Sequence, residues 1–390
     1  MSAIATIIKK RIAKDKGKFF CNDNISKYIR NETELSWIER DVEMKIEELL
    51  LMSAGASKRE AKIVATHSVN ANLAGHDSHG IIQIPVYIDR IQRGHIVPGA
   101  PINIVKETDV TSVIDGNWGF GYVVSEKAMK LTIEKAKKHG VAATIVFRQS
   151  HVGRLTDYPL MACKEGLIAI MTADSGRTAK NVAPYGGRAS RLGTNPICIA
   201  IPSHLDGPMF IDFASSAVAS GKISVAIAKG DSIPEGWIIN SEGNPTTNPN
   251  DLALGGTQLP LGGTEAHKGY GLSVMIEILS GILPGLGFGH DPSGRHNDGC
   301  FMAVFDVSAF HPLQSFKKEV TDFAKYLKET PKAQGFEEIY YPGELEHINT
   351  EKLKANGISV DDNTWDSLHK IAVFYNVERE LECINEKKES

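Results

Sequence analysis

Apolar side chains recur at helical spacing through the first part of the chain. The pattern begins at Asp41 and predicts a helix that ends at Gly55. A second helix is expected after Ser57, because Glu60 stands at the distance of a capping box and an apolar face follows it. Residues 84–91 predict a further helix. The N-terminal part is therefore expected to be mainly helical.

The central part alternates between strand and helix patterns. Residues 100–114 carry β-branched side chains at strand spacing, and a glycine-rich turn at 115–121 leads into a helix that ends near His139. Two strongly apolar strands are expected at 141–147 and 167–171, with another helix between them. This strand–helix–strand alternation predicts a mixed α/β core.

Three regions follow from these patterns. Residues 1–36 are predicted to be an N-terminal extension, residues 37–110 and 310–390 together a mainly helical domain, and residues 111–309 an α/β domain. Within the α/β domain, residues 230–268 are rich in Gly, Pro and Asn and are expected to form a long loop. Loops of that length inside a domain are usually functional or mobile.

Composition and charge exclude several classes of protein. The 390 residues are 42% hydrophobic and 23% charged with a formal net charge of −4, so no basic field favours nucleic acid or anionic membranes. No apolar run reaches the ~18 residues of a transmembrane helix. The five cysteines are odd in number and never form C-x-x-C, which argues against a disulfide framework and for a reducing compartment such as the cytoplasm. The basic N-terminus lacks a convincing secretory cleavage site and fits either a solvated extension or an organellar transit peptide.

Two histidine segments gather groups that move protons. The first is Gly75-His76-Asp77-Ser78-His79-Gly80, and the second places His151 between Gln149 and Arg154. We predict that His79 and His151 face the same small substrate. Interconverting a secondary alcohol and a ketone by hydride transfer needs a group that exchanges the hydroxyl proton near neutral pH, which imidazole does. From spacing alone, a lone histidine also fits a hydrogen-bonded structural role.

Cationic side chains accompany the second histidine. Arg154, Arg177, Arg188 and Arg191 lie in or near the loops around His151. A guanidinium binds a carboxylate through two parallel hydrogen bonds, so these arginines are candidates for holding an acidic substrate.

A metal site is the alternative use of the first segment. His76 and His79 would share one face of a helix, but the E-x-x-H context of zinc hydrolases is missing and no third ligand is evident. His290 and His296, with Asp291 and Asp298 beside them, are expected to lie on a solvated loop.

The glycines at 116, 119 and 121 invite a comparison with dinucleotide-binding loops. A Rossmann fingerprint requires G-x-G-x-x-G and an acidic residue at the end of the next strand. Here the glycine order is reversed and the next strand ends in Phe147-Arg148-Gln149. We therefore interpret the motif as a structural turn, and any nicotinamide site must be built differently.

Taken together, several segments resemble the malate/L-lactate dehydrogenase family over roughly residues 38–380. The segments are Gly75–Gly80, Asp115-Gly116-x-x-Gly119, Ser150-His151-x-Gly153-Arg154, Ala183-Pro184-Tyr185-Gly186-Gly187, Leu192-Gly193-Thr194-Asn195-Pro196, Asp212-Phe213-Ala214-Ser215-Ser216, Gly221-Lys222, His267-Lys268-Gly269-Tyr270-Gly271-Leu272 and Pro342-Gly343-Glu344. Each is weak alone, but in this order they are highly specific.

The resemblance implies a nicotinamide-dependent dehydrogenase of 2-hydroxy acids with a non-Rossmann fold, acting as a homodimer. It implies that His79 or His151 is the proton donor and acceptor. It places the substrate and dimer contacts in the helical domain and the cofactor, NAD or NADP, in the α/β domain. The residues implied to bind the cofactor are Ser175, Asp212, Phe213, Ala214, His267, Lys268, Gly343 and Glu344. Those expected at the substrate are Ser78, Gln83, Arg154 and Arg188.

One position departs from the family pattern. Many members have an arginine four residues after the histidine that matches His79, where it helps to hold the substrate carboxylate, whereas this chain has Gln83. The segment around it is similar to a subgroup that acts on broader or aromatic 2-hydroxy acids. Neither malate nor lactate is therefore singled out, and Arg154 or Arg188 is expected to hold the carboxylate instead.

The leading hypothesis is reversible reduction of a 2-keto acid by NADH or NADPH. A metal-dependent hydrolase that uses His76 and His79 is a second hypothesis. A dinucleotide-binding protein that has lost catalysis is a third, and it would bind the cofactor without turning over any keto acid.

Overall fold

The computed structural model describes residues 35–174, 177–291 and 293–386. Nearly all of the predicted N-terminal extension, residues 1–36, lies outside this part. Ser175 also lies outside the described residues. Among the described helices, none combines the length and apolarity that crossing a bilayer would take.

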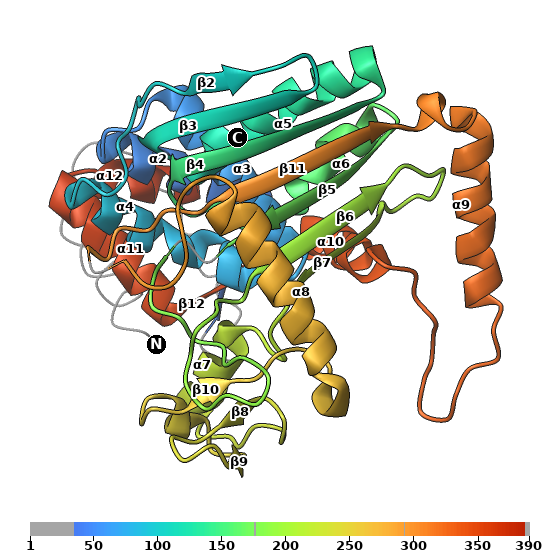
Figure 1. Cartoon of the computed structure of the whole chain (residues 1–390). Coiled ribbons are helices and arrows are strands. Elements are labelled where there is room, and N and C mark those ends of the chain that lie inside the picture. Colours follow the sequence, from blue (N-terminus) through green and yellow to red (C-terminus); the bar gives the residue numbers. More distant parts are fainter. Residues whose placement is uncertain (1–34, 175–176, 292, 387–390) are drawn as a thin grey trace.

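A seven-stranded sheet forms the centre of the molecule, in the order β2-β3-β4-β11-β5-β6-β7 (Figure 1). Its strands are β2 (Asn103–Glu107), β3 (Thr111–Gly119), β4 (Val141–Gln149), β5 (Leu167–Ala173), β6 (Pro196–Ile201), β7 (Met209–Ala214) and β11 (Cys300–Asp306). Strands β3 and β4 are parallel neighbours, joined by helix α5 (Gly121–His139). The other neighbouring pairs are antiparallel. The α/β prediction is thus confirmed as a mixed sheet with helices.

The single strand expected at 100–114 is wrong. The chain reverses between β2 and β3, which pair antiparallel. Thr108 stabilises the reversal, because its Oγ1 accepts hydrogen bonds from the backbone N–H groups of Val110 (3.3 Å) and Thr111 (3.0 Å). Strand β3 then continues through the predicted turn to Gly119, with Trp118 in the left-handed region at φ 68°. Short hydroxyl side chains favour such turns without interrupting a β-branched pattern.

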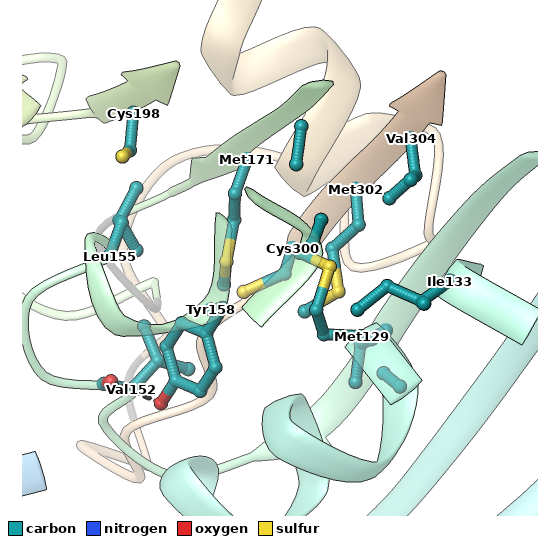
Figure 2. Packing of buried hydrophobic residues seen from close by; sticks show 14 of the residues in the cluster. Met129, Ile133, Val152, Leu155, Tyr158, Met171, Cys198, Cys300, Met302 and Val304 are labelled. Atoms are coloured by element: carbon teal, nitrogen blue, oxygen red, sulfur yellow. Dashed lines mark hydrogen bonds between the residues drawn. The ribbon is translucent and has the colours of Figure 1, made fainter. Parts of the chain in front are cut away.

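The main hydrophobic core lies between the sheet and the helices α5 and α6 (Asp157–Lys164). Figure 2 shows Met129 and Ile133 of α5 beside Cys300, Met302 and Val304 of β11. The figure also shows Val152, Leu155 and Tyr158, which follow β4 and are buried in this core. The chain that leaves β4 is therefore anchored in the core from its third residue, Val152, onward.

A second core joins the two ends of the described chain. Helices α2 (Arg40–Ser53), α3 (Lys58–Leu73) and α4 (Ile84–Gln92) pack with α11 (Asp362–Tyr375) and α12 (Glu378–Glu386). Strand β1 (Leu35–Ile38) pairs antiparallel with β12 (Ile358–Asp361). The capping box predicted at Ser57 and Glu60 is present at the start of α3. N- and C-terminal segments share this core. The bounds of the predicted domains stay a prediction.

The segment 230–268, expected to be a loop, carries a small sheet of its own. Strands β8 (Ile238–Ile239), β9 (Pro245–Thr246) and β10 (Thr257–Gln258) pair antiparallel below helix α7 (Ser220–Lys229) (Figure 1). Strands of two residues are too short to show a period of two in the sequence.

Three further helices complete the fold. Helix α8 (His267–Glu277) continues as a π-helix over Ile278–Ile282. Helix α9 (Leu313–Lys328) stands away from the sheet in Figure 1, and helix α10 (Glu344–Asn356) returns to the body.

Candidate active site

The loop that carries His79 is clamped by one buried side chain. Asn72, near the end of α3, donates from Nδ2 to Oδ1 of Asp77 (2.7 Å), and its Oδ1 accepts from the backbone N–H of Ile81 (2.8 Å). A Cβ at Gly80 would lie 1.7 Å from Oδ1 of Asn72, so this position has no room for a side chain. These contacts on both sides of His79 hold its short 3-10 turn in place.

The segment that carries His151 is positioned by a glycine of α5. A Cβ at Gly121 would lie 2.2 Å from the carbonyl oxygen of Ser150 and 2.3 Å from that of His151. The absence of a side chain therefore lets the chain after β4 cross the start of α5. The interpretation of the glycine motif as structural agrees with this close backbone approach.

The two histidine rings lie side by side. The ring centroids of His79 and His151 are 5.7 Å apart, and their planes differ by 21°. Nδ1 of His151 lies 2.7 Å from the hydroxyl of Tyr87, which lies 3.0 Å from that of Tyr122. Nδ1 of His79 lies 3.0 Å from Oγ of Ser78. No described residue hydrogen-bonds to Nε2 of either ring, so both nitrogens are available to a substrate.

Both rings are held in the neutral form. Burial, reinforced by His76 and Arg154, lowers the pKa of His79 to about 4. Burial lowers the pKa of His151 to about 3, against the opposing charge of Asp298. At neutral pH each imidazole therefore carries an unshared electron pair and can act as a base.

The expectation of a solvated loop is wrong for His296 and Asp298. The His296 ring stands 5.6 Å from that of His151 at 81°, and its Nε2 lies 2.6 Å from Oδ1 of Asp298. Oδ2 of Asp298 accepts a hydrogen bond from the backbone N–H of Val152 (3.0 Å). Although burial works to raise the pKa of Asp298, the neighbouring histidines hold it below its ordinary value. His290 is exposed, as expected.

The sequence shows that His296 and Asp298 stand close to a strand, but it does not show which part of the protein that strand lies beside. Asp298 comes two residues before the apolar strand β11. What the pattern does not show is that β11 pairs with β4, the strand that leads to His151.

The two arginines predicted to bind the substrate differ in burial and in the partners of their guanidinium groups. Arg154 is nearly buried, and its Nε and Nη2 donate to the Asp157 carboxylate at 3.1 and 3.4 Å. Arg188 is near the small β8–β10 sheet, with Nη1 3.5 Å from the carbonyl oxygen of Ser241. Gln83 donates from Nε2 to the carbonyl oxygen of Ser78 (2.8 Å) and so braces the His79 loop.

An arginine that sequence reasoning missed lies beside the histidines. Nη1 of Arg90, on α4, is 3.5 Å from Oγ of Ser150, and its Nη2 is 3.4 Å from Nδ1 of His296. The sequence does place Arg90 three residues after Tyr87, and residues three apart share a helix face. Arg90 could therefore have been expected beside Tyr87.

Some of the residues implied to bind the cofactor lie in the edge strand β7 or at the start of α10. Oδ2 of Asp212, in β7, accepts from the N–H (2.8 Å) and the hydroxyl (2.7 Å) of Thr156. Gly343 is the residue before α10 and lies beside β7, where Phe210 donates its N–H to the carbonyl oxygen of Pro342 (3.1 Å). Glu344 pairs with Lys328. Phe213 and Ala214 end β7.

The remaining implied cofactor residues lie at the start of α8. Lys268 is 71% exposed, with Nζ 3.2 Å from a carboxylate oxygen of Glu265. The ring of His267 lies 5.8 Å from that of Tyr185. Leu261, shortly before α8, donates its N–H to the carbonyl oxygen of Ser215, which brings this helix start close to the end of β7.

The histidines of the first segment do not converge. Nε2 of His76 lies 3.6 Å from Oε1 of Glu346, whereas His79 faces His151. Within the described residues, no group of three or more His, Cys, Asp or Glu side chains is arranged to hold a metal ion. No observation favours the hydrolase hypothesis.

Comparison with known proteins identifies the family. The sequence profile described as malate/L-lactate dehydrogenase matches residues 40–369, most of the chain. The chain belongs to the malate/L-lactate dehydrogenase family. The resemblance drawn from the histidine and glycine segments is thereby confirmed.

Similar proteins include enzymes of several specificities. The malate/(S)-sulfolactate dehydrogenase of Methanothermus fervidus is 40% identical over 346 residues, which cover 87% of this chain and 97% of the relative. Hydroxycarboxylate dehydrogenase B of Escherichia coli K12 is 35% identical over 321 residues, covering 80% and 87%. The crystal structure of malate dehydrogenase from Entamoeba histolytica aligns with a TM-score of 0.84 at 33% identity, covering 88% of this chain and 99% of that chain. This family member is thus similar to dehydrogenases with different named substrates.

Proposed function

We propose that this dehydrogenase interconverts a 2-hydroxy acid and the corresponding 2-keto acid, exchanging the hydride with NAD or NADP. Membership of the family makes the chain an oxidoreductase of hydroxy acids. The observation that carries the proposal is the pairing of His79 and His151, whose Nε2 atoms no described residue engages.

The two histidines suit proton exchange at the substrate carbon. In the oxidation direction, Nε2 of a neutral ring takes the hydroxyl proton while the carbon loses its hydride. In the reduction direction, the protonated ring returns a proton to the oxygen. A nicotinamide ring supplies the hydride acceptor or donor when it is bound. Burial keeps both rings neutral in the free enzyme. For reduction, one ring must therefore take up a proton when the anionic keto acid binds.

We place the dinucleotide along the end of β7 and the starts of α8 and α10. Asp212, Phe213, Ala214, His267, Lys268, Gly343 and Glu344 are the described residues of this proposal, and Ser175 completes it from the sequence. Lys268 supports it, because an exposed ammonium in the first turn of an 11-residue helix suits a phosphate. A non-Rossmann mode of binding is supported by the single parallel strand pair in the described sheet and by the packing role of Gly121.

The substrate is proposed to contact Ser78, Gln83, Arg154 and Arg188 in addition to the histidines. A panel of pyruvate, oxaloacetate, sulfopyruvate and phenylpyruvate, assayed with NADH and with NADPH by loss of absorbance, tests the proposal. We expect turnover of at least one keto acid. A thermal shift with NADH but no turnover on any keto acid would instead favour the protein that has lost catalysis.

A homodimer in the cytoplasm completes the proposal. Helix α9 supports the dimer, because it stands away from the body with Phe323 and Tyr326 57% and 69% exposed (Figure 1). The free thiols of Cys163, Cys198, Cys300 and Cys383, among the described residues, suit a reducing compartment. Light scattering after size exclusion tests the dimer, and a monomer at micromolar concentration would reject it.

A further inference from the structure

Arg90 is a cation beside His151 whose charge is not balanced. Its contacts are Oγ of Ser150 at 3.5 Å and Nδ1 of His296 at 3.4 Å, and both are long for a guanidinium hydrogen bond. No carboxylate lies within ion-pair distance of its guanidinium among the described residues. A guanidinium has five N–H donors in a planar fork that matches a carboxylate. Arg90 therefore keeps donors for an anionic ligand.

The surroundings of Arg90 hold it beside the His151 segment. Tyr87, three residues earlier on α4, reaches Nδ1 of His151 from the same helix face. Nε2 of His296 lies 2.6 Å from Oδ1 of Asp298, and Nδ1 of the same ring lies 3.4 Å from Nη2 of Arg90. Helix α4 thus presents Tyr87 and Arg90 together to the His151 segment, Tyr87 to the His151 ring and Arg90 to Ser150 and His296.

The other arginines near the histidines are less suited to this task. The guanidinium of Arg154 is nearly buried and is already paired with Asp157. Arg188 is near the small β8–β10 sheet and contacts Ser241. At position 83, Gln83 can offer an amide but no charge.

We propose that Arg90 binds the carboxylate of the keto acid and that His296, fixed by Asp298, orients its guanidinium. This inference rests on the proposed function, because it names the residue that recognises the acid group of that substrate. It replaces Arg154 as the principal carboxylate ligand. Two rings that exchange a proton and one guanidinium that fixes the acid group are sufficient to orient a 2-keto acid.

The test compares each keto acid with its neutral methyl ester. Pyruvate and methyl pyruvate, or phenylpyruvate and its methyl ester if the enzyme reduces that acid faster, are assayed with wild type, Arg90→Met, Arg154→Met and the control Arg93→Met. Arg93 is 64% exposed on the same helix and pairs with Asp89. We expect Arg90→Met to lower kcat/KM for the acid by about 10²-fold and for the ester by less than about 3-fold. Arg90→Lys should restore part of the loss, and Arg93→Met should have no effect.

Three outcomes would overturn the inference. An equal loss on acid and ester in Arg90→Met would show that Arg90 only supports the fold. A selective loss for the acid in Arg154→Met, but not in Arg90→Met, would place the carboxylate at Arg154. Failure of the wild type to reduce any keto acid with either coenzyme would reject the proposed function itself, and the inference with it.

Discussion

The rings of His79 and His151 lie 5.7 Å apart and nearly parallel, although one follows α3 and the other follows β4. Each is placed by a different local device. The side chain of Asn72 hydrogen-bonds to both sides of the His79 loop. Gly121 has no side chain, and the backbone at His151 packs closely against it for that reason. The site is therefore assembled where the helical core meets the sheet.

Removing the hydroxyl of Tyr87 should impair His151 without displacing it. The hydroxyl is 2.7 Å from Nδ1 and so helps to set which nitrogen carries the proton. We expect Tyr87→Phe to lower kcat about 10-fold, which corresponds to ~1.4 kcal/mol and lies within the range of one hydrogen bond. Tyr375→Phe removes a hydroxyl that accepts from Gln92 and is the matched control. Identical kcat values and pH profiles in the two variants would contradict the role of Tyr87.

A methyl group at residue 121 should disturb the site through the backbone. Its Cβ would meet the carbonyl oxygens of Ser150 and His151, so Gly121→Ala should lower the free energy of unfolding by about 1–3 kcal/mol and also lower kcat. In contrast, Gly271→Ala on α8 meets no atom within 4 Å and should leave stability equal or slightly higher. Urea unfolding measures both variants. Equal stability of the two would show that the chain after β4 is not held against α5.

Acid should destabilise the protein partly through His151. Its pKa is about 3 in the folded protein and about 6.5 when unfolded, so the unfolded state binds more protons as the pH falls below 6.5. The contribution of the neutral ring is present above that pH and is lost as the pH falls. Between pH 7.5 and 5.5, the wild type should lose about 1 kcal/mol more than His151→Asn in urea unfolding. Parallel curves for the two proteins would contradict the lowered pKa.

The sequence predicted those features that depend on local patterns. The helix from Asp41 and the capping box at Ser57 are present, and the alternation around α5 gives the mixed α/β core. The family followed from short segments in a fixed order. Such features need only neighbouring residues to be recognised.

Features that depend on strand partners could not be predicted. His296 was placed on a solvated loop because the pattern around it is polar, yet β11 pairs with β4 and brings His296 to His151. Arg90 was missed because its partners lie in two other segments of the chain. Sheet order is set by packing over long separations, and the periodicity of one strand does not carry it.

The central claim is that the substrate proton is exchanged at the paired rings of His79 and His151, by one or both of them. The most direct measurement is kcat for reduction of the best keto acid by His79→Asn and His151→Asn, with His290→Asn, an exposed histidine, as the control. The account predicts that kcat falls by about 10²–10⁴ in at least one of the two site variants while the fold is kept, and that the control is unchanged. Turnover near the wild-type value in both site variants would contradict it.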